Sequence, residues 1–293
     1  MHANSMMQFS SGELRTKKPE SLTIKEKFQT LLLGVNITRP KNSSTLIDYG
    51  FSFETHQYSS GTGHTLESWY IPSPLASKIV LLFHGYASSK ESLIPLAVEF
   101  HNSGYDSFLV DFYGSGGSSG NSTSVGFYEA QDVVDSVSYV QKRWPDRSVV
   151  LYGVSMGGAS ILRAIAVESV YIDGVILEST FDKLLNAVKN RFKLMGLPSF
   201  PAAKLLVFWG GWQSGFNAFS HNPVEYARKV KSPALVLHGG KDSRVSLQQA
   251  KQVFRSLAGQ KHFISYPDTG HQLIVKRHRD KWKRDVSQFL ESL

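Results

Sequence analysis

Segments with the pattern of buried strands alternate with segments of helical periodicity along most of this chain. The strand-like segments are rich in apolar, β-branched and aromatic residues and lie at 51–58, 65–71, 77–83, 105–111, 149–151, 174–177, 234–237 and 262–266. Helical spacing occurs at 90–103, 129–143, 159–167, 245–257 and 281–293. This alternation is typical of right-handed strand–helix–strand crossovers. We therefore predict an α/β fold in which a mostly parallel sheet is flanked by helices.

The N-terminal part of the chain has a different pattern. Residues 1–20 are polar and rich in Ser, Lys and Asn, which predicts a disordered or loosely packed tail without the apolar core of a secretory signal. Residues 21–35 have apolar side chains at near-helical spacing. They predict an amphipathic helix that docks on the domain or, as the less favoured alternative, contacts a membrane surface or a partner. We expect this tail and helix over 1–42 and a single domain over 43–293.

An insertion interrupts the alternation between the strand-like segments 174–177 and 234–237. It spans about 182–222, and its aromatic residues are Phe200, Phe208, Trp209, Trp212, Phe216 and Phe219. Its prolines and glycines break it too often for a membrane-spanning helix. The aromatic residues either pack the insertion onto the domain or line an apolar pocket, and the pattern does not favour one of these interpretations.

Composition and charge narrow the possible functions. The chain has 293 residues, of which 41% are hydrophobic, and this is enough for one sizeable core. The absence of cysteine excludes disulfides, thiolate catalysis and Cys-ligated zinc. The net charge of +8 is compatible with anionic surfaces or substrates. However, the Lys- and Arg-rich run 276–285 overlaps a helix with a regular apolar face, which is typical of solvated charges.

The same features bear on partners and location. No nucleic-acid-binding module is found in the sequence, so no nucleic-acid partner is expected. A peripheral membrane contact agrees with the positive charge but has no further pattern in its support. The sequence predicts no oligomeric state, and the cytoplasm is only the default location because an N-terminal leader can be removed.

The stretch 151–159 has the pattern of a sharp turn between a strand and a helix. It contains the frame Gly153-Val-Ser155-Met-Gly157. Such a turn crowds the backbone, so small residues are needed on both sides of the serine, whose hydroxyl is then presented at the end of the sheet. The start of the next helix offers unpaired N–H groups and a positive dipole end to a developing oxyanion. This context favours a nucleophilic serine over an ordinary glycine-rich turn.

Two later residues are candidates to activate this serine. A serine hydroxyl becomes a good nucleophile when an imidazole takes its proton and a carboxylate orients the imidazole. Asp242 and His271 each follow a strand-like segment, so we expect both at the edge of the sheet where Ser155 lies. Glu178 and Asp182 are alternative acids, although the motif and spacing favour Asp242.

Other conspicuous residues have a structural interpretation. His84 and His238, each before a glycine at a strand end, are expected to form structural hydrogen bonds, and Asp268 to belong to the turn before His271. The glycine-rich stretch 114–120 lacks the ending of a phosphate loop, so we interpret it as a flexible turn near the site.

Several motifs of this sequence match the motifs of one known family. In chain order they are His-Gly-Tyr at 84–86, Asp-Phe-Tyr-Gly-Ser-Gly at 111–116, Gly-Val-Ser-Met-Gly at 153–157, His-Gly-Gly-Lys-Asp at 238–242 and Gly-His at 270–271. Over about 51–293 the chain resembles the α/β-hydrolases, specifically the serine hydrolases similar to monoglyceride lipases and serine aminopeptidases. The order Ser155, Asp242, His271 is the one typical of this family. Tyr113 is a departure, because the family often has Arg at this position.

The resemblance implies a function and further site residues. It implies a catalytic triad of Ser155, Asp242 and His271, an oxyanion hole formed by the backbone N–H groups of Tyr86 and Met156, and a cap formed by the insertion. The expected activity is hydrolysis of a small-molecule carboxylic ester with an acyl or aromatic group, through an acyl-enzyme and without metal or organic cofactor. Amide or peptide hydrolysis by the same triad is an alternative, and so is a non-catalytic binding role on the same fold.

Overall fold

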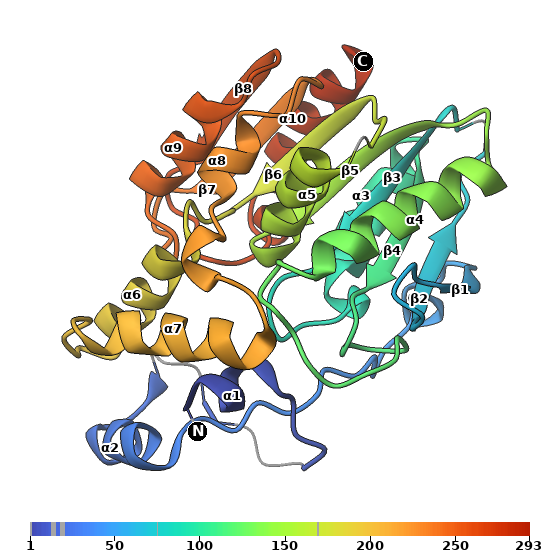
Figure 1. The fold of residues 1–293 in the computed structure, drawn as a ribbon. Helices are drawn as coiled ribbons and strands as arrows, with labels where there is room; N and C mark the ends of the chain where they lie inside the picture. The colour runs from blue at the N-terminus through green and yellow to red at the C-terminus, as the bar shows by residue number, and fades with distance from the viewer. Residues whose placement is uncertain (1, 13–15, 18–20, 75, 169) are drawn as a thin grey trace.

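A sheet of eight strands forms the centre of the described part of the molecule (Figure 1). The structure, a computed structural model, describes residues 2–12, 16–17, 21–74, 76–168 and 170–293. The strands are β1 (Glu54–Ser59), β2 (Thr65–Ile71), β3 (Lys78–Phe83), β4 (Asp106–Asp111), β5 (Ser148–Val154), β6 (Gly174–Glu178), β7 (Ala234–Gly239) and β8 (Lys261–Tyr266). Each coincides with a predicted strand to within a few residues.

The sheet is antiparallel at one edge and parallel elsewhere. The strand order is β1-β2-β4-β3-β5-β6-β7-β8. The hairpin β1–β2 and the pair β2–β4 are antiparallel, whereas the pairs from β4–β3 to β7–β8 are parallel. The predicted α/β fold with a mostly parallel sheet is therefore confirmed. Because parallel strands end at the same edge, the loops after β3, β5, β6, β7 and β8 meet there.

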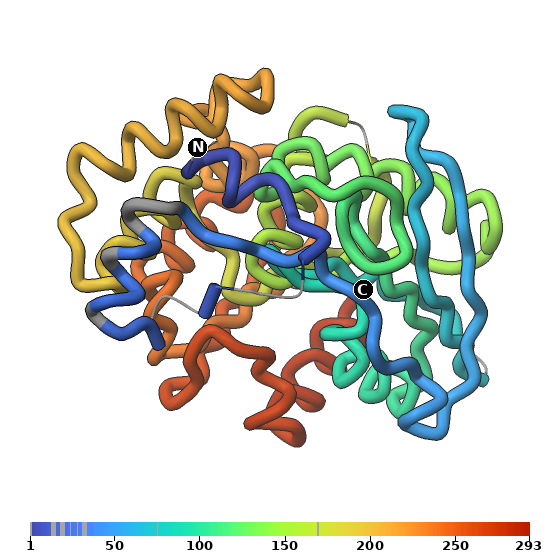
Figure 2. The backbone as a smooth tube through the Cα atoms, turned by 90° about the horizontal axis from the view of Figure 1, so that it is seen from below, coloured from blue at the N-terminus to red at the C-terminus, as the bar shows by residue number. Residues whose placement is uncertain are grey.

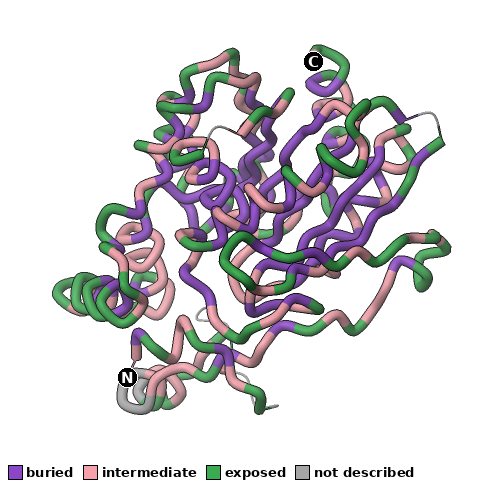
Figure 3. The backbone as a smooth tube through the Cα atoms, turned by 45° about the vertical axis from the view of Figure 1, so that its right-hand side comes forward, coloured by how far each residue is buried: buried purple, intermediate pink, exposed green. Residues whose placement is uncertain are grey.

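Helices cover both faces of the sheet and form two apolar cores. They are α3 (Ile94–Asn102), α4 (Glu129–Arg143), α5 (Met156–Val167), α8 (Pro223–Ala227), α9 (Leu247–Ser256) and α10 (Arg279–Glu291). One core joins the sheet to α4, α5, α8 and α9 through residues such as Val133, Ile161 and Val253. The other joins it to α3 and α10 through Phe100 and Trp282. The strands consequently form the buried middle layer (Figure 3).

The carboxyl end of the sheet is covered by the insertion and by the N-terminal segment (Figures 1 and 2). The insertion holds α6 (Leu184–Leu194) and α7 (Ala202–Ser214), which are followed by the short 3-10 helix η4 (Ala218–Ser220). The N-terminal segment holds α1 (His2–Met7), which packs against α7, and α2 (Ile24–Leu33). Three further 3-10 helices are η2 (Leu46–Tyr49), η3 (Lys90–Leu93) and η5 (Ile274–Lys276).

The N-terminal segment differs from the predicted disordered tail over residues 2–12 and 16–17. The side chain of Phe9 is only 4% exposed, and its backbone N–H donates to the carbonyl of Asn121 at 2.6 Å. The N–H of Ser10 donates to the carbonyl of Ile37 at 2.9 Å. Composition does not reveal this arrangement, because a few apolar residues in a polar segment are enough when the rest of the protein supplies the contacts. Residues 1, 13–15 and 18–20 of the predicted tail lie outside the described residues.

Candidate active site

Ser155 lies at the turn between β5 and α5. Its backbone has φ = 52° and ψ = −107°, a conformation with positive φ that is rare for a residue with a side chain. A Cβ on Gly153 would lie 2.4 Å from the nitrogen of Gly158, and one on Gly157 would lie 2.3 Å from the carbonyl oxygen of Phe83. Backbone contacts therefore require glycine on both sides of Ser155, and the strained turn presents this serine at the end of the sheet.

Two backbone segments adjoin Ser155. A Cβ on Gly85, in the loop after β3, would lie 3.7 Å from the Cβ of Ser155. The next residue, Tyr86, lines the same cavity as Ser155, and its hydroxyl donates to the carbonyl of Met6 at 2.5 Å. Met156 is the first residue of α5, where backbone N–H groups have no intrahelical partner. The two positions expected to bind an oxyanion thus lie next to the serine.

The structure brings Asp242 and His271 together. Nδ1 of His271 lies 2.7 Å from Oδ2 of Asp242, while Oδ1 accepts hydrogen bonds from the N–H groups of Arg244 and Val245, both at 2.9 Å. Burial alone would raise the pKa of Asp242. The hydrogen bond and charge of His271, together with the N–H of Val245, outweigh burial and hold the pKa of Asp242 below its usual value. His271 and Ser155 line one cavity, and Nε2 is the ring nitrogen that Asp242 does not engage.

The alternative acid Glu178 is engaged elsewhere. It ends β6, and its carboxylate accepts hydrogen bonds from the hydroxyl of Tyr152 and from the N–H of Ile274, the latter at 2.9 Å. Burial raises the pKa of Glu178 to about 7, so a large fraction of this carboxyl group is protonated at neutral pH. Glu178 is consequently a buried structural acid between the sheet and the loop before α10.

The second alternative, Asp182, is engaged as well. One oxygen accepts a hydrogen bond from the amide of Asn186 and the other from the amide of Gln249, both at 2.7 Å. These bonds join the start of α6 to α9. Of the candidate acids, Asp242 is thus the one that the structure places against His271.

The two structural histidines differ from each other. In His84, Nδ1 donates to the carbonyl of Gly85 at 2.8 Å and Nε2 accepts from the N–H of Phe112 at 3.2 Å, so both nitrogens are used as expected. Burial lowers the pKa of His84. His238 is also buried, but neither of its ring nitrogens has a hydrogen-bond partner among the described residues. The backbone carbonyl of Val245 nevertheless interacts with its imidazole, so His238 has a weaker structural contact than His84.

A cavity of about 620 Å³ extends from Ser155 and His271, a size typical of small-molecule sites. The insertion and the N-terminal segment form much of its wall. Their apolar lining residues are Met6, Leu22, Val35, Ile37, Leu184, Val188, Phe192, Met195 and Leu206. None of the six aromatic residues singled out in the insertion from the sequence is among the described lining residues. The pocket wall is thus made mainly of aliphatic side chains, together with the aromatic residues Tyr86, Phe181 and Phe192.

The charged residues of this wall have one sign. Lys17, Arg191, Arg244 and Lys276 line the cavity, and no Asp or Glu is found among the described lining residues. The guanidinium of Arg191 lies 4.9 Å from the ring centroid of Tyr86, beside the predicted oxyanion position. The cavity therefore combines an apolar wall with positive charge.

Residues 75–223, half of the chain, match the sequence model of a protein family. This family is described as "Serine aminopeptidase, S33". The chain belongs to this family. The match includes the Ser155 turn and the whole insertion, and it ends before Asp242 and His271.

Similar proteins are found in bacteria and yeast. The chain is 22% identical to YqkD of Bacillus subtilis over 240 residues, covering 80% of this chain and 78% of the relative. It is 26% identical to YfhR of Escherichia coli over 251 residues, covering 83% and 82%. It is 25% identical to the protein bem46 of Schizosaccharomyces pombe over 240 residues, covering 79% and 75%.

Solved structures share the fold. An esterase of Pyrococcus furiosus superposes with a TM-score of 0.73 at 21% identity and covers 88% of this chain and 97% of its own. An acylaminoacyl peptidase of Pyrococcus horikoshii has a TM-score of 0.62 at 18% identity and covers 82% of this chain and 41% of its own. At these identities the likeness establishes the α/β-hydrolase fold.

Family motifs do not reveal Lys90, a cation that is completely buried. Its ammonium group donates to Glu67 at 2.7 Å and, at closer range, to Asp111. Burial alone would raise the pKa of Asp111, but the charge of Lys90 outweighs it and lowers this pKa. The stretch 114–120 closes over the ion pair, since a Cβ on Gly116 would lie 1.8 Å from the Asp111 carboxylate. No described residue of this stretch lines the cavity, although the stretch follows β4, whose carboxyl end lies at the same edge of the sheet as those of β3 and β5.

The sequence offered one signal for this cluster. Asp111 ends a strand in which every residue is buried, and a buried carboxylate needs a cation. A Lys or Arg is therefore expected near Asp111, but the sequence does not identify this residue as Lys90.

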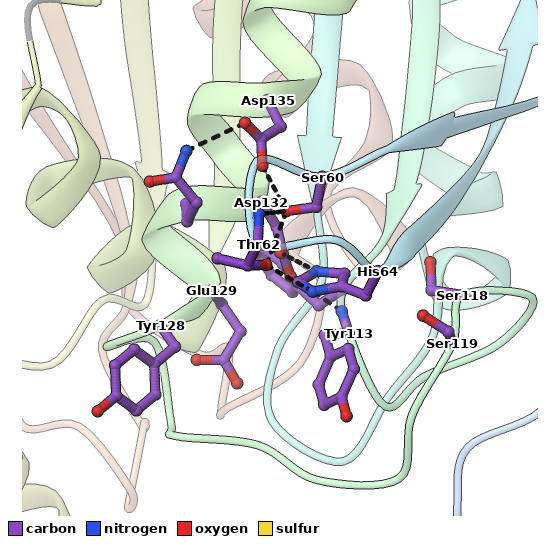
Figure 4. Close-up of polar contacts among 12 residues, drawn as sticks. Ser60, Thr62, His64, Tyr113, Ser118, Ser119, Tyr128, Glu129, Asp132 and Asp135 are labelled. Carbon is purple, nitrogen blue, oxygen red and sulfur yellow. Dashed lines mark hydrogen bonds and ion pairs between the residues drawn. The ribbon is translucent and has the colours of Figure 1, made fainter. Parts of the chain in front are cut away.

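A second hydroxyl–imidazole–carboxylate chain lies outside the cavity (Figure 4). Oγ1 of Thr62 is 2.6 Å from Nδ1 of His64, whose Nε2 is 2.9 Å from Oδ1 of Asp132. Oδ2 of Asp132 accepts a hydrogen bond from the N–H of Tyr113 at 2.9 Å, and the Tyr113 ring packs 4.7 Å from His64. The cluster ties the β1–β2 hairpin to α4 and explains how Tyr113 fits where the family often has Arg. Its role is structural.

The described residues contain no group of three or more His, Asp or Glu side chains positioned to hold a metal ion.

Proposed function

We propose that this protein is a serine hydrolase that cleaves carboxylic esters through an acyl-enzyme. The observation that carries the proposal is the cavity lined by Ser155 and His271, in which the buried carboxylate of Asp242 holds Nδ1 of the imidazole. The strained turn at Ser155 and the two adjoining backbone segments support the same chemistry. Membership of a serine hydrolase family agrees with it.

The reaction begins when Oγ of Ser155 attacks the ester carbonyl carbon and its proton moves to Nε2 of His271. Asp242 accepts the Nδ1–H bond and stabilises the imidazolium. The tetrahedral oxyanion accepts hydrogen bonds from the N–H groups of Tyr86 and Met156. Collapse breaks the ester C–O bond, and the alcohol leaves with the proton from Nε2. Water then attacks the acyl-Ser155 by the same sequence, which releases the acid and restores the serine.

The charge of the cavity favours esters over the substrates of an aminopeptidase. A free peptide N-terminus carries an ammonium group, whose recognition needs a carboxylate or other acceptors. Lys17 is paired with Glu26 at 2.8 Å, but the described lining also offers Arg191, Arg244 and Lys276 and no acidic side chain, which disfavours an ammonium group. An ester with an apolar acyl chain fits the aliphatic wall.

Covalent labelling tests the proposal. A fluorophosphonate should modify the wild type on the peptide that contains Ser155 and should leave Ser155→Ala unmodified. Hydrolysis of p-nitrophenyl butyrate should fall at least about 10⁴-fold in Ser155→Ala, as is typical when a nucleophile is removed. The control Ser220→Ala removes an exposed serine outside the cavity and should keep full activity. Labelling at another residue, or activity that survives in Ser155→Ala, would contradict the proposal.

The acyl pocket has a test of its own. Each buried methylene contributes about 0.8 kcal/mol, so kcat/KM should rise from p-nitrophenyl acetate to the octanoate. Val188→Trp fills the wall formed by α6 and should remove that rise while keeping acetate hydrolysis. An unchanged preference for the octanoate in this variant would mean that the acyl chain binds elsewhere.

A further inference from the structure

Helix α7 has its apolar side chains arranged opposite to those of an ordinary surface helix. The buried residues of α7 are small or medium-sized: Ala203, Val207, Gly210 and Gly211. The large residues on the other side, Leu205, Phe208, Trp209 and Trp212, are between 49% and 74% exposed. They recur at helical spacing, and we call them the aromatic face. A helix in a globular protein usually turns its large apolar residues to the core.

Close packing explains why the inward side of α7 holds small residues. A Cβ on Gly210 would lie 3.2 Å from the sulfur of Met7 in α1, and one on Gly211 would lie 2.6 Å from the carbonyl oxygen of Phe216. Neighbouring segments therefore approach the helix too closely for a large side chain. Among the described residues the aromatic face has no such neighbour to bury it, so its composition calls for a partner outside the protein.

The aromatic side chains lie together and continue beyond the helix. The ring centroids of Phe208 and Trp209 are 5.3 Å apart, and those of Phe208 and Trp212 are 6.4 Å apart. Phe200, just before α7, is 73% exposed, and the ammonium group of Lys204 lies 5.5 Å from its ring centroid. Such rings with an apolar body and, in tryptophan, one N–H donor suit the boundary between hydrocarbon and water.

The positive charge of the insertion, which includes Lys204 beside Phe200, points to the partner. Residues 183–224 contain five basic residues, Lys183, Lys189, Arg191, Lys193 and Lys204, and no Asp or Glu. Lys193 and Lys204 are exposed. We propose that the aromatic face binds the surface of a lipid bilayer that contains anionic lipids. The combination of exposed aromatic residues and basic residues is the pattern of helices that lie in the membrane interface.

The geometry agrees with a helix that lies on a membrane. None of the described helices has the length and apolar character required to cross a bilayer. A second copy of the chain fits this face less well, because a symmetric contact would bring the positive charges of both insertions together. Leu206 of α7 and Met195 at the end of α6 line the cavity, so a bilayer on the aromatic face would lie close to the cavity wall.

Vesicle binding tests the proposal. The wild type should sediment with phosphatidylcholine vesicles that contain phosphatidylglycerol, with a blue shift of tryptophan emission, and much less with phosphatidylcholine alone. Trp209→Ser combined with Trp212→Ser should weaken binding at least about tenfold, because two large apolar side chains no longer enter the interface. Lys193→Glu combined with Lys204→Glu should weaken it at least about fivefold per charge.

Matched controls keep the test specific. Tyr171→Ser changes an 83% exposed residue just before β6, at the opposite edge of the sheet, and Lys251→Glu changes an exposed lysine on α9. Both should bind vesicles like the wild type. The tryptophan double variant should hydrolyse a soluble short-chain ester at the wild-type rate, which shows that it is folded. Ser155→Ala should bind vesicles normally, so a failure of docking and a failure of the proposed hydrolysis are distinguished.

Several results would overturn the proposal. Vesicle binding that is absent in the wild type, or unaffected by the tryptophan changes, would do so. Sedimentation equilibrium measures whether the protein forms a dimer. A dimer that dissociates only when Trp209 and Trp212 are replaced would assign the aromatic face to a second copy of the chain.

Discussion

The sheet edge at Ser155 and the aromatic face of α7 depart from ordinary burial in opposite directions. At the sheet edge, the charged group of Asp242 is buried and satisfied by His271 and two backbone N–H groups. On α7, Trp209 and Trp212 are exposed although they are among the most apolar side chains available. Buried polar groups and exposed apolar patches are the informative exceptions to the rule of an apolar core. We infer that the first exception serves chemistry and the second serves binding.

The largest expected effect concerns the buried carboxylate at the sheet edge. Asp242→Asn should lower kcat for ester hydrolysis by about 10⁴-fold, because the amide favours the wrong tautomer of His271. Asp182→Asn is the matched control, since Asp182 pairs with Asn186 and Gln249 and not with His271. Its kcat should stay within about tenfold of the wild type. Equal losses in the two variants, measured with p-nitrophenyl butyrate, would remove the distinction between Asp242 and its neighbours.

A smaller expected effect concerns the free energy of unfolding. It compares the loss of a buried charge with the loss of an exposed apolar side chain. Lys90→Met should lower the free energy of unfolding by about 3–5 kcal/mol, because it leaves Asp111 buried without its cation. Trp212→Ser, at an exposed position, should change it by no more than about 0.5 kcal/mol. Urea denaturation followed by circular dichroism measures both. If the tryptophan change proved as destabilising as the lysine change, the aromatic face would be part of the core and not a free surface.

The smallest expected effect depends on pH and concerns the cluster at His64. Burial raises the pKa of Asp132 to about 6, and the hydrogen bond to Asp132 raises the pKa of His64. Both shifts mean that the folded protein holds protons more tightly than the unfolded chain. The stability from the His64 charge is therefore greatest between about pH 6, below which Asp132 takes up its own proton, and the raised pKa of His64, through which it is lost as the pH rises.

Replacement of His64 checks this pH dependence. His64→Gln should lower the free energy of unfolding by about 1 kcal/mol near pH 6 and by less near pH 8. The control His262→Gln removes an exposed histidine of β8 and should show no such trend. A His64→Gln effect that grows with pH would mean that the neutral imidazole is the stabilising form.

The sheet and the polar residues at its edge could be predicted because their signals are local. Gly153 and Gly157 are needed by contacts within one turn, and the apolar run before Asp242 identifies a buried strand. The predicted helix 129–143 coincides with α4, whose apolar stripe faces the sheet.

The features that could not be predicted depend on contacts between distant segments. The packing of α1 on α7 decides which side of α7 faces outward, and residues 1–20 carry no pattern that reveals it. For the same reason, the two interpretations of the aromatic residues hold unevenly: Phe216 packs on Phe127 as the first predicts, whereas Trp209 and Trp212 are largely exposed and do not line the cavity. The role of Lys90, in η3, likewise depends on Glu67 of β2 and Asp111 of β4.

Rapid quenching followed by mass spectrometry tests most directly whether Ser155 performs the proposed chemistry. During hydrolysis of p-nitrophenyl butyrate, the wild type should carry one butyryl group on the peptide that contains Ser155, formed together with a burst of p-nitrophenol. The adduct should be absent from Ser155→Ala. Hydrolysis that proceeds without a butyryl group on Ser155, or an adduct on a different residue that forms and decays at the rate of turnover, would contradict the account.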